Sequence, residues 1–393
     1  NQAYTSFYPY YQQIKTEKPS YVINGNRAEG IKVPDPYSTD ITWETIQTTD
    51  IGVDIALFSN RFNASFDWYE RKTKDMVGPA VALPNIYGAK IPKTNNAELR
   101  TRGWELELVW RDRINKDWGY EIGGSLSDYS DVITKYESSD KSLKDDNFYV
   151  GKNLGDIYGY RVHGIAQNDN EMNEWIKNGH DQSGISQNWG GGDFMYEDLD
   201  GDGKITSGAN TLDNKGDLTI IGNSTPRFQY SIRGSLTWRF LDFSMFWQGI
   251  GKRDLFFTSS TFDGMGDAYD RPMAEEHMDY FRYADSPFGE NLNAYYARPR
   301  TDDANNKPND YYLQNGAYIR LKNITLGYTL PKNTKLKKVV KNLRVYVSAE
   351  NLFTLTPLRV FDPEAIGLST STWGMGLTYP MFRTFSIGLT VTL

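Results

Sequence analysis

The sequence predicts an all-β chain that forms part of a transmembrane antiparallel β-barrel with long external loops. Three observations support this class: long segments alternate between apolar and polar residues, aromatic residues are abundant (27 Tyr, 19 Phe and 10 Trp among 393 residues), and no apolar run is long enough for a spanning helix. The mean hydropathy of −0.61 is polar. That value is compatible with a barrel, because lipid-facing and lumen-facing residues alternate along each strand. The alternative is a soluble β-sandwich or propeller.

The clearest predicted strand covers residues 227–240. Its residues alternate without interruption, which is the period expected of a strand with two different faces. A tight turn is predicted at Leu241-Asp242, and the next strand begins at Phe243. The apolar face of this hairpin consists of Phe228, Tyr230, Ile232, Gly234, Leu236, Trp238 and Phe240, followed by Phe243, Met245, Trp247 and Gly249.

Seven further strands are predicted in the same way, at 43–58, 61–76, 99–111, 118–132, 311–330, 343–355 and 379–393. Spanning strands need about 9–11 residues when tilted, whereas strands of soluble proteins average about 5–6. The longer predicted strands therefore favour a barrel over a sandwich. Their apolar faces include Ile51, Val53, Ile55 and Leu57; Phe62, Ala64, Phe66 and Trp68; Trp104, Leu106, Leu108 and Trp110; Trp118, Tyr120, Ile122 and Leu126; Ile324, Leu326 and Tyr328; Val345 and Val347; and Phe385, Ile387, Leu389 and Val391.

Short and long connections alternate along the chain, as expected when short turns face the periplasm and long loops face outside. The predicted organisation is an extracellular loop at 1–42, four strands in 43–132, a long extracellular loop at 133–225, a strand hairpin in 226–255, an extracellular loop with a short helix (271–283) at 256–310, and the last three strands in 311–393. The strand-like segment 155–166 is assigned to the external loop, because a spanning strand there would break the alternation. The C-terminus is then periplasmic.

Several segments resemble the C-terminal part of SusC/RagA-type TonB-dependent outer-membrane transporters of Bacteroidetes. They are 316–331 (GAYIRLKNITLGYTLP), 343–356 (LRVYVSAENLFTLT), Asp362-Pro-Glu364, Thr42-Trp-Glu44 with Asp54, 71–75 (RKTKD) and 157–160 (IYGY). The resemblance implies a barrel of 22 strands, of which these would be the last nine, together with a plug and a TonB box. It also implies a SusD/RagB-like surface lipoprotein that covers the barrel.

Nine strands are not expected to stand alone in lipid, because both sheet edges would leave backbone groups unpaired where water cannot reach them. The predicted partners are therefore outer-membrane lipid, the remaining strands and plug of the same protein, TonB through an N-terminal part, and the lipoprotein. The resemblance implies import of a bulky nutrient, a glycan or an oligopeptide. A scaffold or adhesion barrel without transport and a passive porin remain alternatives. The net charge of −7 argues against a nucleic-acid partner.

One motif predicts a metal site. Asp198, Asp200 and Asp202, followed by Gly203, fit the first half of a calcium loop, D-x-D-x-D-G. Lys204 would contribute its backbone carbonyl. The expected Glu at position 12 is replaced by Ala209, so the motif is incomplete. The resembling family closes a similar loop with a later Asp, which Asp217 matches; Asp213 is an alternative. We expect a structural Ca²⁺, with a solvated acidic turn as the alternative.

The sequence predicts no catalytic residue, since it contains neither a G-x-S-x-G nor an H-E-x-x-H motif. Loop aromatics could stack on a substrate or equally pack within their own loops. The weak candidates for substrate contact are Trp175, Trp189, Tyr269, Tyr295 and Tyr296.

Overall fold

A nine-stranded antiparallel sheet dominates the computed structural model, and its strands are adjacent in chain order. The structure describes residues 15–18, 21–22, 25, 27, 29–32, 36, 38, 41–79, 91–137, 141–144, 147–257, 262, 275–300, 302–331, 340–359, 361–365 and 379–392. The strands are β3 (Thr45–Leu57), β4 (Phe62–Val77), β5 (Asn95–Arg113), β6 (Trp118–Tyr136), β11 (Arg227–Trp238), β12 (Leu241–Lys252), β15 (Tyr318–Thr329), β16 (Asn342–Leu355) and β17 (Thr384–Thr392).

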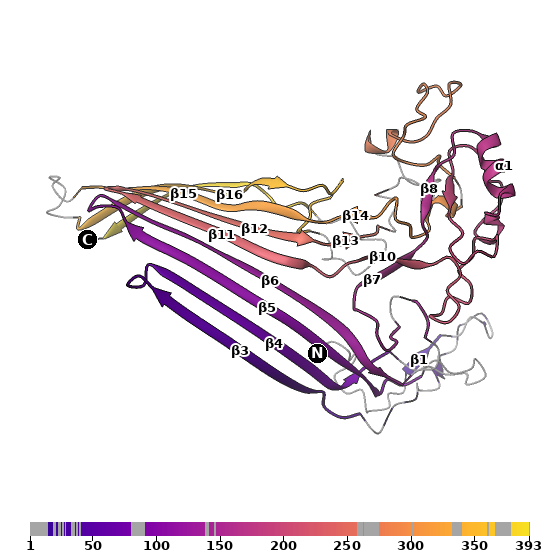
Figure 1. The fold of residues 1–393 in the computed structure, drawn as a ribbon, viewed down its shortest axis with the longest axis horizontal. Helices are drawn as coiled ribbons and strands as arrows, with labels where there is room; N and C mark the ends of the chain where they lie inside the picture. The colour runs from indigo at the N-terminus through magenta and orange to yellow at the C-terminus, as the bar shows by residue number, and fades with distance from the viewer. Residues whose placement is uncertain are drawn as a thin grey trace.

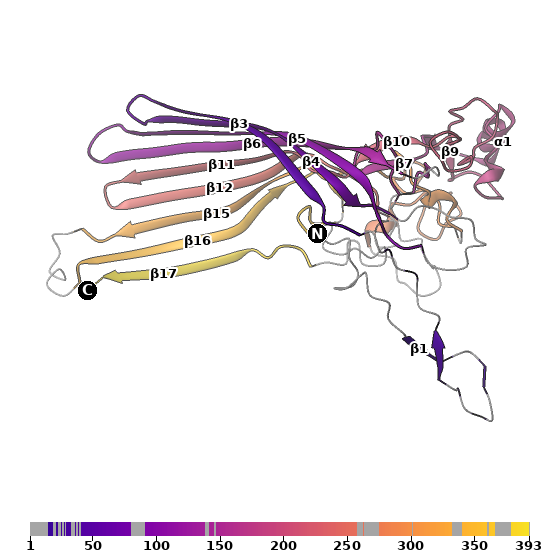
Figure 2. The ribbon, with the colours of Figure 1, turned by 90° about the horizontal axis from the view of Figure 1, so that it is seen from below.

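The two ends of the sheet differ (Figures 1 and 2). Short turns at 58–61, 114–117 and 239–240 lie at one end, where β15 also ends and β16 begins. We call this the short-turn end. At the other end the connections 137–226 and 253–317 fold together; we call their described residues the head. The two outermost strands of the sheet, β3 and β17, are each paired on one side only within the described residues.

Cross-strand register places apolar residues on one face of the sheet and polar residues on the other. One apolar row runs across eight strands, and the adjacent row on the opposite face is polar throughout. The apolar row is Ile55, Ala64, Leu108, Gly124, Ile232, Trp247, Leu321 and Phe353. The polar row is Asp54, Ser65, Glu107, Ser125, Ser231, Gln248, Arg320 and Thr354.

The apolar face is not covered by other parts of the described chain. Ile232 and Leu108 are 42% and 41% exposed, although each lies within the apolar row, and Phe353 at its end is 46% exposed. Aromatic rings gather at the short-turn end of this face, where Trp118 stacks on Trp238 with ring centroids 5.3 Å apart and Phe240 contacts Tyr328. An exposed apolar band edged by aromatic rings is the pattern of a barrel wall in lipid.

Three cross-strand pairs place a tyrosine ring directly over a glycine of the neighbouring strand. The pairs are Tyr69 with Gly103, Tyr230 with Gly249, and Tyr346 with Gly388. In each pair a Cβ added to the glycine would overlap the tyrosine ring. The ring covers backbone that a glycine would otherwise leave bare, so each pair fixes the local register.

The structure corrects the predicted hairpin turn. Trp238 pairs with Leu241, so the turn is Arg239-Phe240 and not Leu241-Asp242. Arg239 has a φ of +53°, and the stacking of Trp238 on Trp118 holds the end of β11 in the sheet. The strand predicted at 311–330 is also interrupted, because β14 (Gln314–Asn315) leaves the sheet to pair with β13 (Asp254–Leu255).

The buried core of the described residues lies mainly in the head. Tyr196, Tyr296, Tyr312 and Phe194 are almost fully buried there. Phe194 contacts Tyr196 and Tyr312 edge to face, and Tyr296 packs against Tyr312 at a tilt. The segment predicted to lie in a loop, 155–166, forms β7 (Asp156–Gly159) and β8 (Val162–Ile165), outside the nine-stranded sheet. They pair with β10 (Thr219–Asn223) and β9 (Phe194–Tyr196), respectively.

Helical structure is sparse. The head contains α1 (Asp169–Lys177) and the 3₁₀ turns η2 (Gln182–Gly184), η3 (Glu275–Met278) and η4 (Ala304–Asn306). Of the helix predicted at 271–283, residues 271–274 lie outside the described residues, and η3 alone is helical in the remainder. Among the described helices, none has the length and apolar character needed to cross a membrane. A small hairpin of β1 (Lys15–Glu17) and β2 (Gly30–Lys32) precedes the sheet.

Gly388→Val should weaken the pairing of β17 with β16, because the new side chain would overlap the Tyr346 ring. Overpacking of this kind costs about 1–3 kcal/mol. The measurement is the fraction of complete protein that migrates as a folded, heat-modifiable band in detergent gels. Combining Gly388→Val with Tyr346→Ala should restore that fraction; a double variant as poor as Gly388→Val alone would contradict the assigned contact.

Candidate functional site

The head contains an acidic loop at 198–203 that brings three carboxylates together. One oxygen from each of Asp198, Asp200 and Asp202 lies within 4.8 Å of the others. Gly201 and Gly203 have φ values of +79° and +81°, a conformation that favours glycine, so the chain can curl around the carboxylates. Asp198 accepts hydrogen bonds from the N–H groups of Gly201 and Gly203, at 2.7 and 2.8 Å. Burial opposes ionisation, but these bonds hold the pKa of Asp198 below its ordinary value.

The other predicted ligands occupy distinct positions. Asp217 is fully buried behind the loop and accepts hydrogen bonds from Leu199 N–H and Thr206 N–H, both at 2.7 Å. Burial raises the pKa of the Asp217 carboxyl, although these two hydrogen bonds act to lower it. Lys204 donates its N–H to Asp202 at 2.8 Å. Asp213 lies elsewhere, in an exposed ion pair with Lys141 at 2.9 Å. The fold therefore brings Asp217, and not Asp213, to the acidic loop.

A buried charge network joins the two long connections of the head. The fully buried Asp193 accepts hydrogen bonds from Arg298 (2.7 and 2.6 Å), Arg300 (2.8 Å) and Asn305 (3.0 Å). We call these four residues the head clamp. Arg300 also bonds Asp302, and this bond holds the pKa of the Asp302 carboxyl far below its ordinary value. Because a buried charge is tolerated only when it is paired and hydrogen-bonded, the clamp ties the two connections into one body.

A second network lies at the head end of β15. Arg320 has a side chain that is only 3% exposed, and it bonds Asp362 at 2.7 Å and Glu364 at 2.6 Å. Lys322 also pairs with Glu364, at 2.9 Å. Asp362 and Glu364 belong to the segment that carried the family resemblance. Their ion pairs hold the connection after β16 against the polar face of β15.

The predicted substrate-contact aromatics pack within the head where they are described. Trp175 is stacked between His163 and His180, with centroid distances of 4.7 and 3.9 Å. Trp189 donates to the Ser186 carbonyl and lies under Arg300; Tyr295 lies under Arg359; Tyr296 is 1% exposed. Tyr269 lies outside the described residues. A substrate contact for these side chains stays a prediction.

The head clamp and the imidazole–indole stack were not predicted from the sequence. Asp193 and its partners are 105–112 residues apart, so no local spacing links them. The run Gly190-Gly-Gly192 reads as a flexible loop, whereas Gly190 N–H donates to the Asp193 carboxylate at 3.0 Å. The single available signal was the concentration of arginine in the segment 298–300.

Together, these features define the wall of a transmembrane β-barrel with a folded head at one end. The chain belongs to the TonB dependent receptor-like, β-barrel family, whose model matches residues 1–352. The predicted fold class is thereby confirmed, and the protein is an outer-membrane β-barrel protein.

Relatives support the same assignment. The chain is 30% identical over 405 residues to TonB-dependent receptor P3 of Formosa agariphila, and 24% identical over 401 residues to TonB-dependent receptor SusC of Bacteroides thetaiotaomicron. These alignments cover 98% and 95% of this chain but 38% and 35% of the relatives. The chain thus corresponds to a C-terminal part of such receptors. The prediction that it is not an enzyme is also confirmed, because these relatives are receptors.

A solved structure, that of the RagAB peptide transporter, has the same fold with a TM-score of 0.68 at 21% identity. The match covers 97% of this chain and 38% of that chain. A closed-closed state of the RagAB peptide importer matches with a TM-score of 0.66 at 19% identity.

Asp193→Ala should loosen the head, because it leaves the largely buried Arg300 and its neighbour Arg298 without their shared carboxylate. Removing one partner of a buried pair costs about 3–5 kcal/mol. We expect faster hydrogen–deuterium exchange around residues 193 and 300, with unchanged exchange in β11 and β12. Asp303→Ala is the matched control, since Asp303 is 72% exposed and pairs with Lys307. Equal exchange in both variants would contradict the clamp.

Proposed function

We propose that this chain is the C-terminal barrel portion of a TonB-dependent importer that carries a bulky nutrient across the outer membrane, together with a SusD-like surface lipoprotein. The observation that carries the proposal is the similarity to TonB-dependent receptors along almost the whole chain, including SusC. The nutrient would be a glycan or an oligopeptide. The solved RagAB neighbour is described as a peptide transporter, but at 21% identity it supports the fold alone, so both classes of nutrient stay in the proposal.

The polar face of the sheet fits the interior of such an importer. Arg233 pairs with Glu107 at 2.6 Å, and Arg344 pairs with Asp242, so charges on this face are neutralised across strands. A wall of paired charges, Ser and Thr would contact a plug or a hydrated substrate without burying an isolated charge. The remaining strands and the plug would come from the rest of the protein. In this arrangement the short-turn end and the C-terminus are periplasmic, and the head is extracellular.

We also propose that the acidic loop binds Ca²⁺ with a structural role. Asp198, Asp200 and Asp202 would supply carboxylate oxygens, Lys204 its backbone carbonyl, and Asp217 a further carboxylate. An all-oxygen donor set with clustered negative charge suits this hard cation. Bound Ca²⁺ would relieve the repulsion among the three carboxylates. Asp217, which already accepts hydrogen bonds from Leu199 in the loop and Thr206 just after it, would couple the ion to the rest of the head.

A measurement of solute uptake distinguishes the importer from the two alternative functions. We expect uptake of a labelled oligopeptide or glycan mixture by cells that carry the complete protein, and loss of that uptake when TonB is deleted. A passive porin would continue to take up the solute without TonB. A scaffold or adhesion barrel would not take it up in either strain. Purification from outer membranes should also recover a stoichiometric surface lipoprotein.

Asp200→Ala combined with Asp202→Ala should abolish calcium protection of the head. The expected affinity lies in the weak extracellular range, on the order of 10⁻⁴–10⁻³ M. The measurement is the rate of limited proteolysis within 133–225, with calcium and with a chelator. Asp213→Ala is the control, because Asp213 pairs with Lys141 away from the loop. If the unsubstituted protein is cleaved at the same rate with and without calcium, the calcium proposal is wrong.

A further inference from the structure

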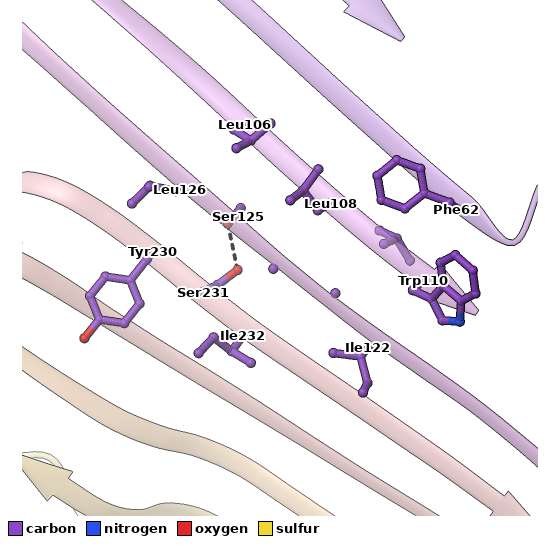
Figure 3. Close-up of a pocket in the computed structure, with 13 residues that line it drawn as sticks. Phe62, Leu106, Leu108, Trp110, Ile122, Ser125, Leu126, Tyr230, Ser231 and Ile232 are labelled. Carbon is purple, nitrogen blue, oxygen red and sulfur yellow. Dashed lines mark hydrogen bonds between the residues drawn. The ribbon is translucent and has the colours of Figure 1, made fainter. Parts of the chain in front are cut away.

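Among the described residues, the apolar face of the sheet contains a groove that its own side chains do not fill. It has a volume of about 500 Å³ and is lined almost entirely by carbon atoms of β4, β5, β6 and β11. Leu106, Leu108 and Trp110 stand on one side of it, and Tyr230 and Ile232 stand on the other (Figure 3).

The groove exists because Gly124 interrupts an apolar row. Cross-strand register places Leu108 on one side of Gly124 and Ile232 on the other, so two walls flank a position without a side chain. Every other glycine of the nine strands has a neighbour's side-chain atom within 4 Å of the place its Cβ would occupy. At Gly124 the single neighbour at that range is a backbone atom, the Ser231 carbonyl oxygen at 2.9 Å. Gly124 is therefore the one strand glycine that no side chain covers.

The groove opens toward the aromatic rings of the short-turn end. Phe62 and Trp110 line it there, with ring centroids 6.3 Å apart, and Trp110 donates its Nε1–H to Tyr120 Oη at 3.1 Å. Aromatic side chains with one polar atom are typical of the level of lipid headgroups. From Ile122 to Leu126 the groove follows β6 for roughly 13 Å, at about 3.3 Å per residue. The groove therefore follows the strand direction, and it begins at the expected headgroup level.

We propose that this groove, the Gly124 groove, holds one acyl chain of a glycerophospholipid from the leaflet at the short-turn end. The groove continues an apolar face that, in an outer-membrane β-barrel, contacts hydrocarbon and not water. Water is a poor occupant, because the groove offers it almost no polar partner. An acyl chain restores the packing that the missing side chain at Gly124 removes. This lipid contact is independent of what the protein transports.

The test is native mass spectrometry of the complete protein in detergent, titrated with dioleoyl phosphatidylethanolamine. Leu108→Phe should fill the groove from one wall and weaken lipid retention about tenfold, the factor expected when roughly two methylene groups lose their apolar burial. Leu326→Phe is the matched control: Leu326 lies on the same face, outside the groove, and is 47% exposed against 41% for Leu108. It should retain lipid as the unsubstituted protein does.

Ile232→Phe fills the groove from the opposite wall and should weaken lipid retention in the same way. It serves as the test variant if Leu108→Phe does not fold. In the unsubstituted protein, a phospholipid brominated near the headgroup end of its acyl chains should also quench the fluorescence that Trp110→Phe removes. Equal lipid retention in Leu108→Phe, Ile232→Phe and Leu326→Phe, without quenching of Trp110, would overturn the proposal. The proposal would also be overturned if the protein retained a second copy of itself in place of a lipid and Leu108→Phe abolished that association.

Discussion

The structure depends on one constraint: a backbone that crosses hydrocarbon must form all its hydrogen bonds within the protein. The meander of nine antiparallel strands meets it by pairing each strand with the next in the chain. The strict apolar and polar rows follow, because each strand separates lipid from a polar interior. The constraint also singles out β3 and β17, because each is paired on one side only within the described residues.

The head has a different role: it orders the two long connections that lie outside the nine-stranded sheet. Its core is built from tyrosine and phenylalanine rings, and the clamp of Asp193 with Arg298, Arg300 and Asn305 joins segments more than a hundred residues apart. The acidic loop lies in the same body, and Asp217 accepts hydrogen bonds from Leu199 within it and from Thr206 just after it. Removal of charge at either place is therefore expected to act on the head and leave the sheet intact.

Glycine serves opposite purposes at different places in the sheet. At Gly103, Gly249 and Gly388 it makes room for a tyrosine ring from the next strand. At Gly124 it allows close approach of the Ser231 carbonyl and leaves the lipid side open. Glycine thus allows closer packing of two strands in the first case, and in the second it leaves the groove that we propose for an acyl chain.

Local pattern was sufficient to predict the strands and their faces, because alternation and length follow from the chain crossing a membrane. The carboxylates of Asp198, Asp200 and Asp202 were also predictable, since a loop of six residues brings them together without help from the fold. The turn at Arg239-Phe240 was not, because stacking of Trp238 on Trp118 sets where β11 ends. The pairing of Asp193 with its arginines and the Gly124 groove both arise from residues distant in the chain. Folding brings them together, and no spacing within the sequence encodes such contacts.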